Sequence, residues 1–231
     1  MGRGSVAREA NERKKASADL GREFGNWCDR NSVCEAVRIF LIRLFALSLT
    51  ITSSGFEVIT TCAKSNFDYV KSLGADVVFD SRSETAGSDI RAYTRDKLYY
   101  AWDCIGEHGS PQAIGEALAS SAPDGQKIRH GTIVPGKAHR DDTTFTFSLA
   151  YTAQGEAIDI MGMFQLPALP DHSDFAVKWL EVVERLYARG RISMHRAEVR
   201  DGGLEGLLDG LDDLRNGRVS GVKLVYRVAD S

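Results

Sequence analysis

The chain contains 231 residues, with 43% hydrophobic and 26% charged side chains, proportions typical of a globular domain in water. The formal net charge is −3, and no basic stripe interleaved with aromatic residues is present, so the composition argues against nucleic-acid binding. The length allows one large domain, or one domain with an appendage.

The cysteines and histidines indicate neither a disulfide framework nor a metal site. No two cysteines form C-x-x-C, and their scatter is typical of reduced thiols, so we expect a cytoplasmic protein. No two histidines share a ligand pair at helical spacing, so we expect no zinc site. The residues concerned are Cys28, Cys34, Cys62 and Cys104, and His108, His130, His139, His172 and His195.

Residues 1–54 differ in character from the rest of the chain and form an atypical N-terminal segment. Residues 1–32 are polar and charged, which predicts flexibility, and their G-x-G-x-x-A match at Gly2–Ala7 follows no strand. The apolar run Val37–Ile51 is interrupted by two arginines and is shorter than the ~20 residues that a bilayer requires. We therefore expect a buried helix or strand there, and no membrane anchor.

From Phe56 onward, strand and helix patterns alternate over short connections. Such alternation predicts an α/β fold, a Rossmann-like doubly wound sheet that is mostly parallel, with ligands at the carboxyl ends of its strands. The expected strands are Phe56–Cys62, Val77–Phe79, Tyr99–Ile105 and Lys127–Val134, and the expected helices are Asn66–Leu73, Ser88–Thr94 and Ser110–Ser120.

The second half of the chain continues with a strand at Thr144–Leu149, a helix from Ser173-Asp174 to Gly190, and a final strand at Val222–Val228. Two stripes of apolar residues at helical spacing are expected to face the core. The first comprises Val177, Leu180, Val183 and Tyr187, and the second comprises Leu204, Leu207, Leu208, Leu211 and Leu214.

The turn after the first expected strand, Ala63-Lys64-Ser65-Asn66, lies where a dinucleotide-binding sheet meets the adenosine ribose. A carboxylate at this place selects NAD, whereas this turn offers an ammonium, a hydroxyl and an amide, all of which can donate to a 2′-phosphate. Two readings stay open. The turn binds NADPH, or Ser65 or Asn66 caps the following helix while Lys64 is a solvated turn residue.

Residues 55–231 resemble the second half of the medium-chain dehydrogenase/reductase superfamily. Within it they are most similar to the zinc-independent, stand-alone trans-enoyl reductases that work beside fungal polyketide synthases in secondary metabolism. The segments that carry the resemblance are FEVITTCAKSNFDYVKSLGADVVFD, YYAWDCIG and NGRVSGVKLVYRV. The resemblance implies that residues 55–231 form an NADP-binding domain.

The resemblance also implies site residues. In the family the turn reads Cys-Ser-Pro-x-Asn-Phe and contacts the 2′-phosphate of NADPH; Asn66 matches, while Ala63 and Lys64 depart from it. Ser81 stands where a tyrosine commonly lies against the adenine. The resemblance also implies that Ile133 and Val134 pass the nicotinamide ring, and that Val219 and Ser220 lie in the last loop, which approaches the nicotinamide end. Gly155 and Glu156 are implied for the substrate, although a plain glycine turn explains Gly155 equally well.

The implied chemistry is hydride transfer from NADPH to the β-carbon of an α,β-unsaturated acyl thioester, carried by a polyketide synthase partner. No side chain in residues 55–231 is an evident general acid. His130 and Tyr151 are conceivable donors, but a lone polar residue is more often structural. The catalytic residues are therefore left unassigned.

Two departures from the family set limits on this interpretation. Nothing in residues 1–54 corresponds to the family's N-terminal GroES-like domain, and no glycine occurs between Gly25 and Gly55, where the first Rossmann strand and its glycine-rich turn belong. Either Val37–Ile51 supplies that element as strand or helix, or the domain is incomplete through truncation or a misassembled reading frame. We therefore expect either an NADPH-dependent reductase with weak turnover, or a non-catalytic remnant that binds nucleotide or a partner.

Overall fold

The computed structural model describes residues 38–42, 57–162, 164–190, 192 and 195–228. The expectation of a flexible segment at residues 1–32 lies outside these ranges, and so does most of the apolar run. Among the helices within them, none combines the length and the apolar composition needed to cross a bilayer.

The main architectural feature is a six-stranded sheet with the strand order β3-β2-β1-β4-β5-β6. Every neighbouring pair is parallel. This order is that of a Rossmann fold, so the predicted α/β class is confirmed. The strands are β1 (Arg38–Ile42), β2 (Glu57–Cys62), β3 (Val77–Asp80), β4 (Tyr100–Asp103), β5 (Arg129–Thr132) and β6 (Thr144–Phe147).

The centre of the sheet is occupied by β1, which comes from the apolar run. Phe40 is in register with Ile59 on one side and with Ala101 on the other. Of the alternatives left open for this run, a strand is therefore the one observed at Arg38–Ile42, and the backbone groups of β2 and β4 that face the centre are paired. The connection between β1 and β2 lies outside the described residues.

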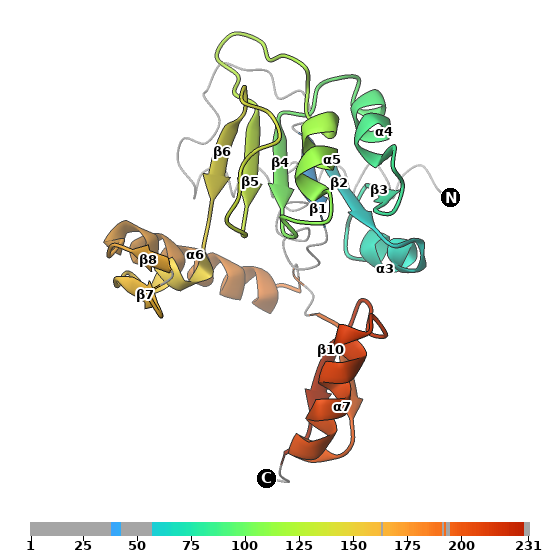
Figure 1. Cartoon of the computed structure of the whole chain (residues 1–231), viewed down its shortest axis with the longest axis vertical. Coiled ribbons are helices and arrows are strands. Elements are labelled where there is room, and N and C mark those ends of the chain that lie inside the picture. The colour runs from blue at the N-terminus through green and yellow to red at the C-terminus, as the bar shows by residue number, and fades with distance from the viewer. Residues whose placement is uncertain (1–37, 43–56, 163, 191, 193–194, 229–231) are drawn as a thin grey trace.

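Short helices follow the strands as predicted, with ends that differ by a few residues. A 3-10 turn, η1 (Lys64–Asn66), leads into α3 (Phe67–Ser72), and α4 (Ala86–Tyr93) and α5 (Ser110–Ala117) follow β3 and β4. Figure 1 shows α4 and α5 side by side over one face of the sheet. This arrangement leaves the carboxyl ends of the strands open for a site.

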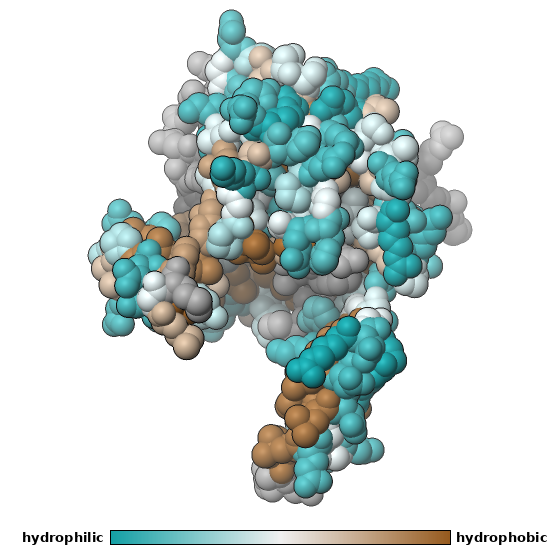
Figure 2. All heavy atoms as spheres, viewed as in Figure 1, coloured by the Kyte–Doolittle hydropathy of each residue, from teal (hydrophilic) through white to brown (hydrophobic). Residues whose placement is uncertain are grey.

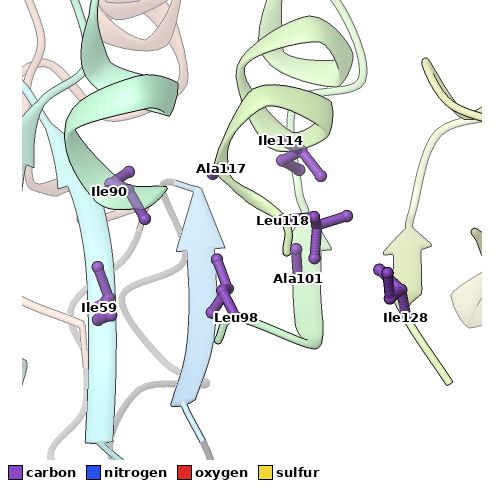
Figure 3. Close-up of a cluster of buried hydrophobic side chains, with 8 residues drawn as sticks. All are labelled: Ile59, Ile90, Leu98, Ala101, Ile114, Ala117, Leu118 and Ile128. Atoms are coloured by element: carbon purple, nitrogen blue, oxygen red, sulfur yellow. The ribbon is translucent and has the colours of Figure 1, made fainter. Parts of the chain in front are cut away.

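The core lies between the sheet and the helices α4 and α5. Its largest members, Ile59, Ile90, Leu98, Ile114 and Leu118, are all 0% exposed, and Figure 3 shows them converging from β2, α4, α5 and the segment before β4. Burying one such side chain contributes about 1.5–3 kcal/mol. This packing fixes the strand ends that carry the candidate site.

Beyond β6 the chain leaves the main sheet. It forms the 3-10 turn η2 (Ala150–Gln154), an antiparallel hairpin of β7 (Ile158–Ile160) and β8 (Phe164–Leu166), and the helix α6 (Pro170–Ala188). A separate unit follows, in which β9 (Ala197–Arg200) and β10 (Lys223–Tyr226) pair in parallel and α7 (Gly203–Arg215) connects them. The sequence analysis predicted neither the hairpin nor β9.

The predictions for α6 need two corrections. The helix begins at Pro170 rather than at Ser173-Asp174, because proline at the first helical position needs no N–H partner. Its buried residues are Val182 and Leu186, whereas Val177, Leu180 and Tyr187 of the predicted core stripe are 57%, 63% and 51% exposed. The stripe was assigned to the wrong face of the helix.

The leucine stripe of α7 was also predicted to be core, and this prediction is wrong for the described chain. The five leucines are between 40% and 68% exposed. Figure 2 shows them as a brown band along the unit that holds α7. The face of α7 that does pack is lined by glycines, since a Cβ on Gly210 would collide with the Tyr226 side chain of β10.

Candidate cofactor site

A cleft of about 680 Å³ lies at the carboxyl ends of β2, β3 and β4. The volume is within the range of roughly 300–1,000 Å³ that small-molecule sites usually have. Thr61 of β2, Ser81 after β3, and Ile105, Gly109 and Ser110 around the start of α5 contribute to its lining. In a doubly wound sheet, ligands bind at the carboxyl ends of the strands.

Asp103 organises the wall of this cleft that follows β4. Its side chain is fully buried, and its Oδ1 accepts hydrogen bonds from the backbone N–H groups of Ile105 (2.8 Å) and Gly106 (3.0 Å). Its Oδ2 accepts a hydrogen bond from the Ser110 hydroxyl at 2.7 Å. One carboxylate thus ties the end of β4 to the first turn of α5 and fixes the loop between them.

The loop after β4 lies against the end of β5. Gly106 has a φ of +70°, and a Cβ at this position would lie 2.6 Å from Cβ of Val134. Glycine is therefore required, both for the left-handed backbone and for the close approach. Val134 and the 41% exposed Ile133 follow β5 directly. The two predicted cofactor residues therefore lie at the carboxyl ends of the strands, as the cleft does.

Ser81 has a hydrogen-bonding capacity that the described residues do not use. Its hydroxyl is buried and has no partner, while its backbone N–H donates to the Cys62 carbonyl at 3.0 Å. Buried hydroxyls are nearly always hydrogen-bonded. An unpaired one in the wall of a cleft indicates a place where a bound group would supply the partner.

The turn at the end of β2 is built as a donor cluster rather than as a helix cap. Asn66 occupies the N-cap position of α3, but its side chain makes no capping hydrogen bond. Its Nδ2 instead donates to Oγ of Ser220 at 2.8 Å. Because this oxygen accepts from Asn66, its own O–H is available to donate to a ligand. The capping alternative is therefore wrong for Asn66.

Lys64 and Ser65, the other polar members of the turn, are exposed. Lys64 has a 79% exposed side chain whose Nζ lies 3.6 Å from Oδ2 of Asp80, at the end of β3. Ser65 is exposed, and Ala63 stands before η1 with an extended backbone. The turn thus presents its polar groups to solvent at the carboxyl end of β2. Val219 adjoins it through its neighbour Ser220.

The predicted substrate residues lie away from this turn, at the end of η2. Gly155 has a φ of +77°, and a Cβ there would lie 2.9 Å from Cβ of Ser173 in α6. The left-handed backbone and the close approach to α6 are therefore enough to explain a glycine at position 155. Glu156 is exposed beside it, and nothing in the described structure brings Glu156 to the cleft.

The two conceivable proton donors differ in placement. His130 is 2% exposed within β5, with its ring 5.2 Å from Phe145 in an edge-to-face contact and its Nε2 unpaired. Burial lowers the pKa of His130, against a smaller opposing effect of Asp103, so its neutral form is favoured. Tyr151 is 58% exposed on η2. The buried histidine is a packing residue of the sheet.

Sequence reasoning missed Asp103 and Ser110, which fix the loop of the cleft. A signal was available, since a strand that ends in Asp and is followed by Gly at the third position is typical of an aspartate that accepts backbone N–H groups. It also missed the contact of Arg196 with the Tyr69 ring of α3, which joins residues distant in sequence.

Residues 44–178 match the family model described as zinc-binding dehydrogenase. This match covers more than half of the chain. The chain belongs to the zinc-binding dehydrogenase family. The expected membership in the medium-chain dehydrogenase/reductase superfamily is therefore confirmed. Within the described ranges, no group of three or more His, Cys, Asp or Glu side chains is placed to hold a metal ion.

Curated relatives are fungal trans-enoyl reductases. The chain is 37% identical over 177 residues to trans-enoyl reductase apdC of Emericella nidulans, covering 76% of this chain and 52% of that protein. It is 32% identical over 213 residues to trans-enoyl reductase iliB of Hypocrea jecorina, covering 91% of this chain and 60% of that protein. The chain spans about half the length of the curated relatives it matches.

Solved structures share the fold at low identity. The CurK enoyl reductase matches with a TM-score of 0.59 and 14% identity, over 84% of this chain and 56% of that one. CurA of Vibrio vulnificus in complex with NADPH matches with a TM-score of 0.58 and 14% identity, over 94% and 63%. These similarities show that the chain shares their α/β fold.

Proposed function

We propose that this protein is an NADPH-dependent oxidoreductase of the trans-enoyl reductase type. Its substrates would be α,β-unsaturated acyl thioesters, presented by a polyketide synthase in fungal secondary metabolism. Support comes from the similarity to fungal trans-enoyl reductases and from the site geometry. We assign the NADP-binding role to residues 55–231, and we propose a cytoplasmic location on the basis of the four scattered cysteines, no two of which form C-x-x-C.

The observation that carries the proposal is the turn at the end of β2. A dinucleotide in this fold places its adenosine ribose beside that turn. Here the turn holds the Lys64 ammonium, the Ser65 hydroxyl and the Asn66 amide, and its own residues include no carboxylate. Ammonium, amide and hydroxyl groups donate to phosphate oxygens, which favours a 2′-phosphate over a 2′-hydroxyl.

The cleft fits the rest of the adenosine in two respects. The unpaired hydroxyl of Ser81 offers a hydrogen bond inside it, and Gly109 at the start of α5 leaves open space, since a Cβ there would meet nothing within 4 Å. When bound, the nicotinamide of the cofactor supplies the hydride. The chain's own residues bind and orient the nucleotide. Ile133 and Val134 would border the nicotinamide end, and Gly155 and Glu156 the acyl group.

The test is cofactor binding with a charge-reversed turn. We expect the fluorescence of NADPH to rise on binding, with a lower Kd for NADPH than for NADH. Lys64→Glu should erase or reverse this preference, because a carboxylate at the turn repels the 2′-phosphate. Lys127→Glu is the matched control, since Lys127 is exposed just before the amino end of β5, whereas the turn follows the carboxyl end of β2.

Equal affinities of the unaltered protein for NADPH and NADH would refute the role of the turn. The enzymatic part of the proposal is tested by NADPH oxidation with crotonyl thioester and longer enoyl thioesters, with and without a polyketide synthase partner. Binding of NADPH without any oxidation under both conditions would instead favour a nucleotide-binding protein that lacks catalysis.

A further inference from the structure

The helix α7 carries an apolar face that the rest of the described chain leaves exposed. Its five leucines are between 40% and 68% exposed and form a band along the helix (Figure 2). Single apolar side chains are common on protein surfaces, but a contiguous row of this kind marks an interaction site. The leucines are Leu204, Leu207, Leu208, Leu211 and Leu214.

The spacing of these leucines is that of a helix that pairs with another helix. It places Leu204 and Leu211 at one core position of a seven-residue repeat, and Leu207 and Leu214 at the other. These four side chains form what we name the leucine seam. The seam extends over the whole of α7 (Gly203–Arg215), which is about 20 Å long. It therefore fits a second helix of similar length.

The place of α7 in the fold leaves the leucine seam accessible. The helix packs on β10 through Gly210, which lies against the side chains of Leu224 and Tyr226, so the glycine side contacts the two-stranded sheet. Figure 1 shows the unit of β9, α7 and β10 extending away from the six-stranded sheet. A second helix can therefore approach the leucines without meeting the main sheet.

The leucine seam is complementary to itself when two copies of α7 run in opposite directions. In this arrangement Leu204 lies against Leu214 of the second copy, and Leu207 lies against Leu211 of the second copy. The same contacts recur in the other direction, as a twofold axis requires. Every leucine of the seam then meets a leucine.

The charges at the two ends of α7 fit the same arrangement. Asp201 precedes the helix and Arg215 is its last residue; both are exposed, and neither side chain has a partner within the described ranges. Two seven-residue repeats separate them, so they flank the same side of the seam. An antiparallel pair brings Arg215 of each copy near Asp201 of the other, whereas a parallel pair would bring like charges together.

We propose that this chain forms a homodimer in which α7 pairs antiparallel with α7 of a second copy through the leucine seam. The twofold axis passes near Asp209, halfway between Leu204 and Leu214. The interface is small, because it consists of two short helices, so we expect a dissociation constant on the order of 10 μM. This inference does not depend on the proposed function.

The experiment measures the mass of the full chain by sedimentation equilibrium between roughly 1 and 200 μM, where a dimer of this strength assembles. Leu204→Asp and Leu211→Asp should each raise the dissociation constant about a hundredfold, because each removes two leucine contacts per dimer and buries two carboxylates. Leu180→Asp is the matched control, since Leu180 is a 63% exposed leucine of α6. It should leave the dissociation constant unchanged.

A charge exchange tests the antiparallel arrangement. Arg215→Asp and Asp201→Arg each place like charges together twice per dimer, so each should raise the dissociation constant about tenfold at low ionic strength. The double variant Asp201→Arg/Arg215→Asp restores opposite charges and should recover the original value. The thermal unfolding midpoint of each variant reports whether its fold is intact.

A chain that stays monomeric over the whole concentration range refutes the inference, and indicates that a segment of the same chain or a different protein covers the leucines. A dimer that persists in both leucine variants also refutes it, because such a dimer uses another surface. A dimer that the leucine variants dissociate, but that the single charge variants leave unchanged, refutes the antiparallel pairing. Dissociation by the leucine variants, together with recovery in the double charge variant, supports the inference.

Discussion

The carboxylate of Asp103 is the residue whose removal should damage the site most. It accepts two backbone N–H hydrogen bonds and one hydroxyl hydrogen bond inside the protein, and it is 0% exposed. A hydrogen bond to a charged group contributes about 1.5–3 kcal/mol, and donors left unpaired in the interior lose this. Because such losses are not additive, we expect Asp103→Ala to lower the free energy of unfolding by about 3–5 kcal/mol.

Asp103→Asn provides a graded comparison. The amide oxygen still accepts from the N–H groups of Ile105 and Gly106, and the Ser110 hydroxyl can rotate to accept from the new NH₂ group. Only the charge is lost, so we expect a decrease of about 1–2 kcal/mol. In this variant the loop beside the cleft should be less well fixed, and the affinity for NADPH should fall.

The assay is urea unfolding, with the free energy of unfolding taken from the midpoint at an unchanged slope. Asp124→Ala serves as the control, because Asp124 is an exposed aspartate in the segment before β5 and its removal should change stability by less than about 0.5 kcal/mol. A loss of under about 1 kcal/mol in Asp103→Ala would show that the three hydrogen bonds do not hold the loop, and would refute this reasoning.

Two further outcomes follow from buried positions in β5. Gly131→Ala would place a Cβ 2.5 Å from Cζ3 of Trp102, so we expect urea unfolding to show a loss of about 1–3 kcal/mol; Gly136→Ala, whose Cβ would meet nothing within 4 Å, is the control. His130 concerns pH. Because burial lowers its pKa below 6.5, the unfolded chain takes up the proton first as the pH falls. The free energy of unfolding should therefore drop from about pH 6.5 downward, by at most about 1.4 kcal/mol per pH unit, and a slope that persists in His130→Leu would contradict this.

The parts of the fold that could be predicted are those with a local cause. Strands β2 to β5 follow from β-branched or apolar runs that end at glycines and polar turns, and the helical patterns between them predict crossovers that pair the strands in parallel. Strand β1 could not be assigned in this way, because an apolar run of this length is compatible with a strand or a helix. The run forms a strand because it pairs with both β2 and β4. This pairing depends on distant residues, so the sequence of the run alone does not predict it.

The apolar stripes of α6 and α7 show a different limit. A period of 3.6 identifies which side of a helix is apolar, but it does not say what covers that side. In α6 two apolar faces compete, and the face with Val182 and Leu186 is the buried one. In α7 the leucines remain exposed, because the helix packs on β10 through glycines that admit the Tyr226 ring. The glycines of α7, and not its leucines, therefore determine which face of the helix packs.

The candidate site combines local and distant causes, and only the local ones could be predicted. Lys64 and Asn66 were identified because the turn after a strand has a known place beside the ribose. From the turn alone, however, Asn66 could equally be a helix cap, since Asn is a common N-cap residue. The hydrogen bond from its Nδ2 to Ser220 removes that alternative, and the contact of Arg196 with the Tyr69 ring joins the same two parts of the chain. Both contacts join residues from opposite ends of the described chain. The specificity that we infer for the turn therefore depends on how the C-terminal unit packs against α3, and substitutions at that contact should change cofactor preference even though they lie outside the turn.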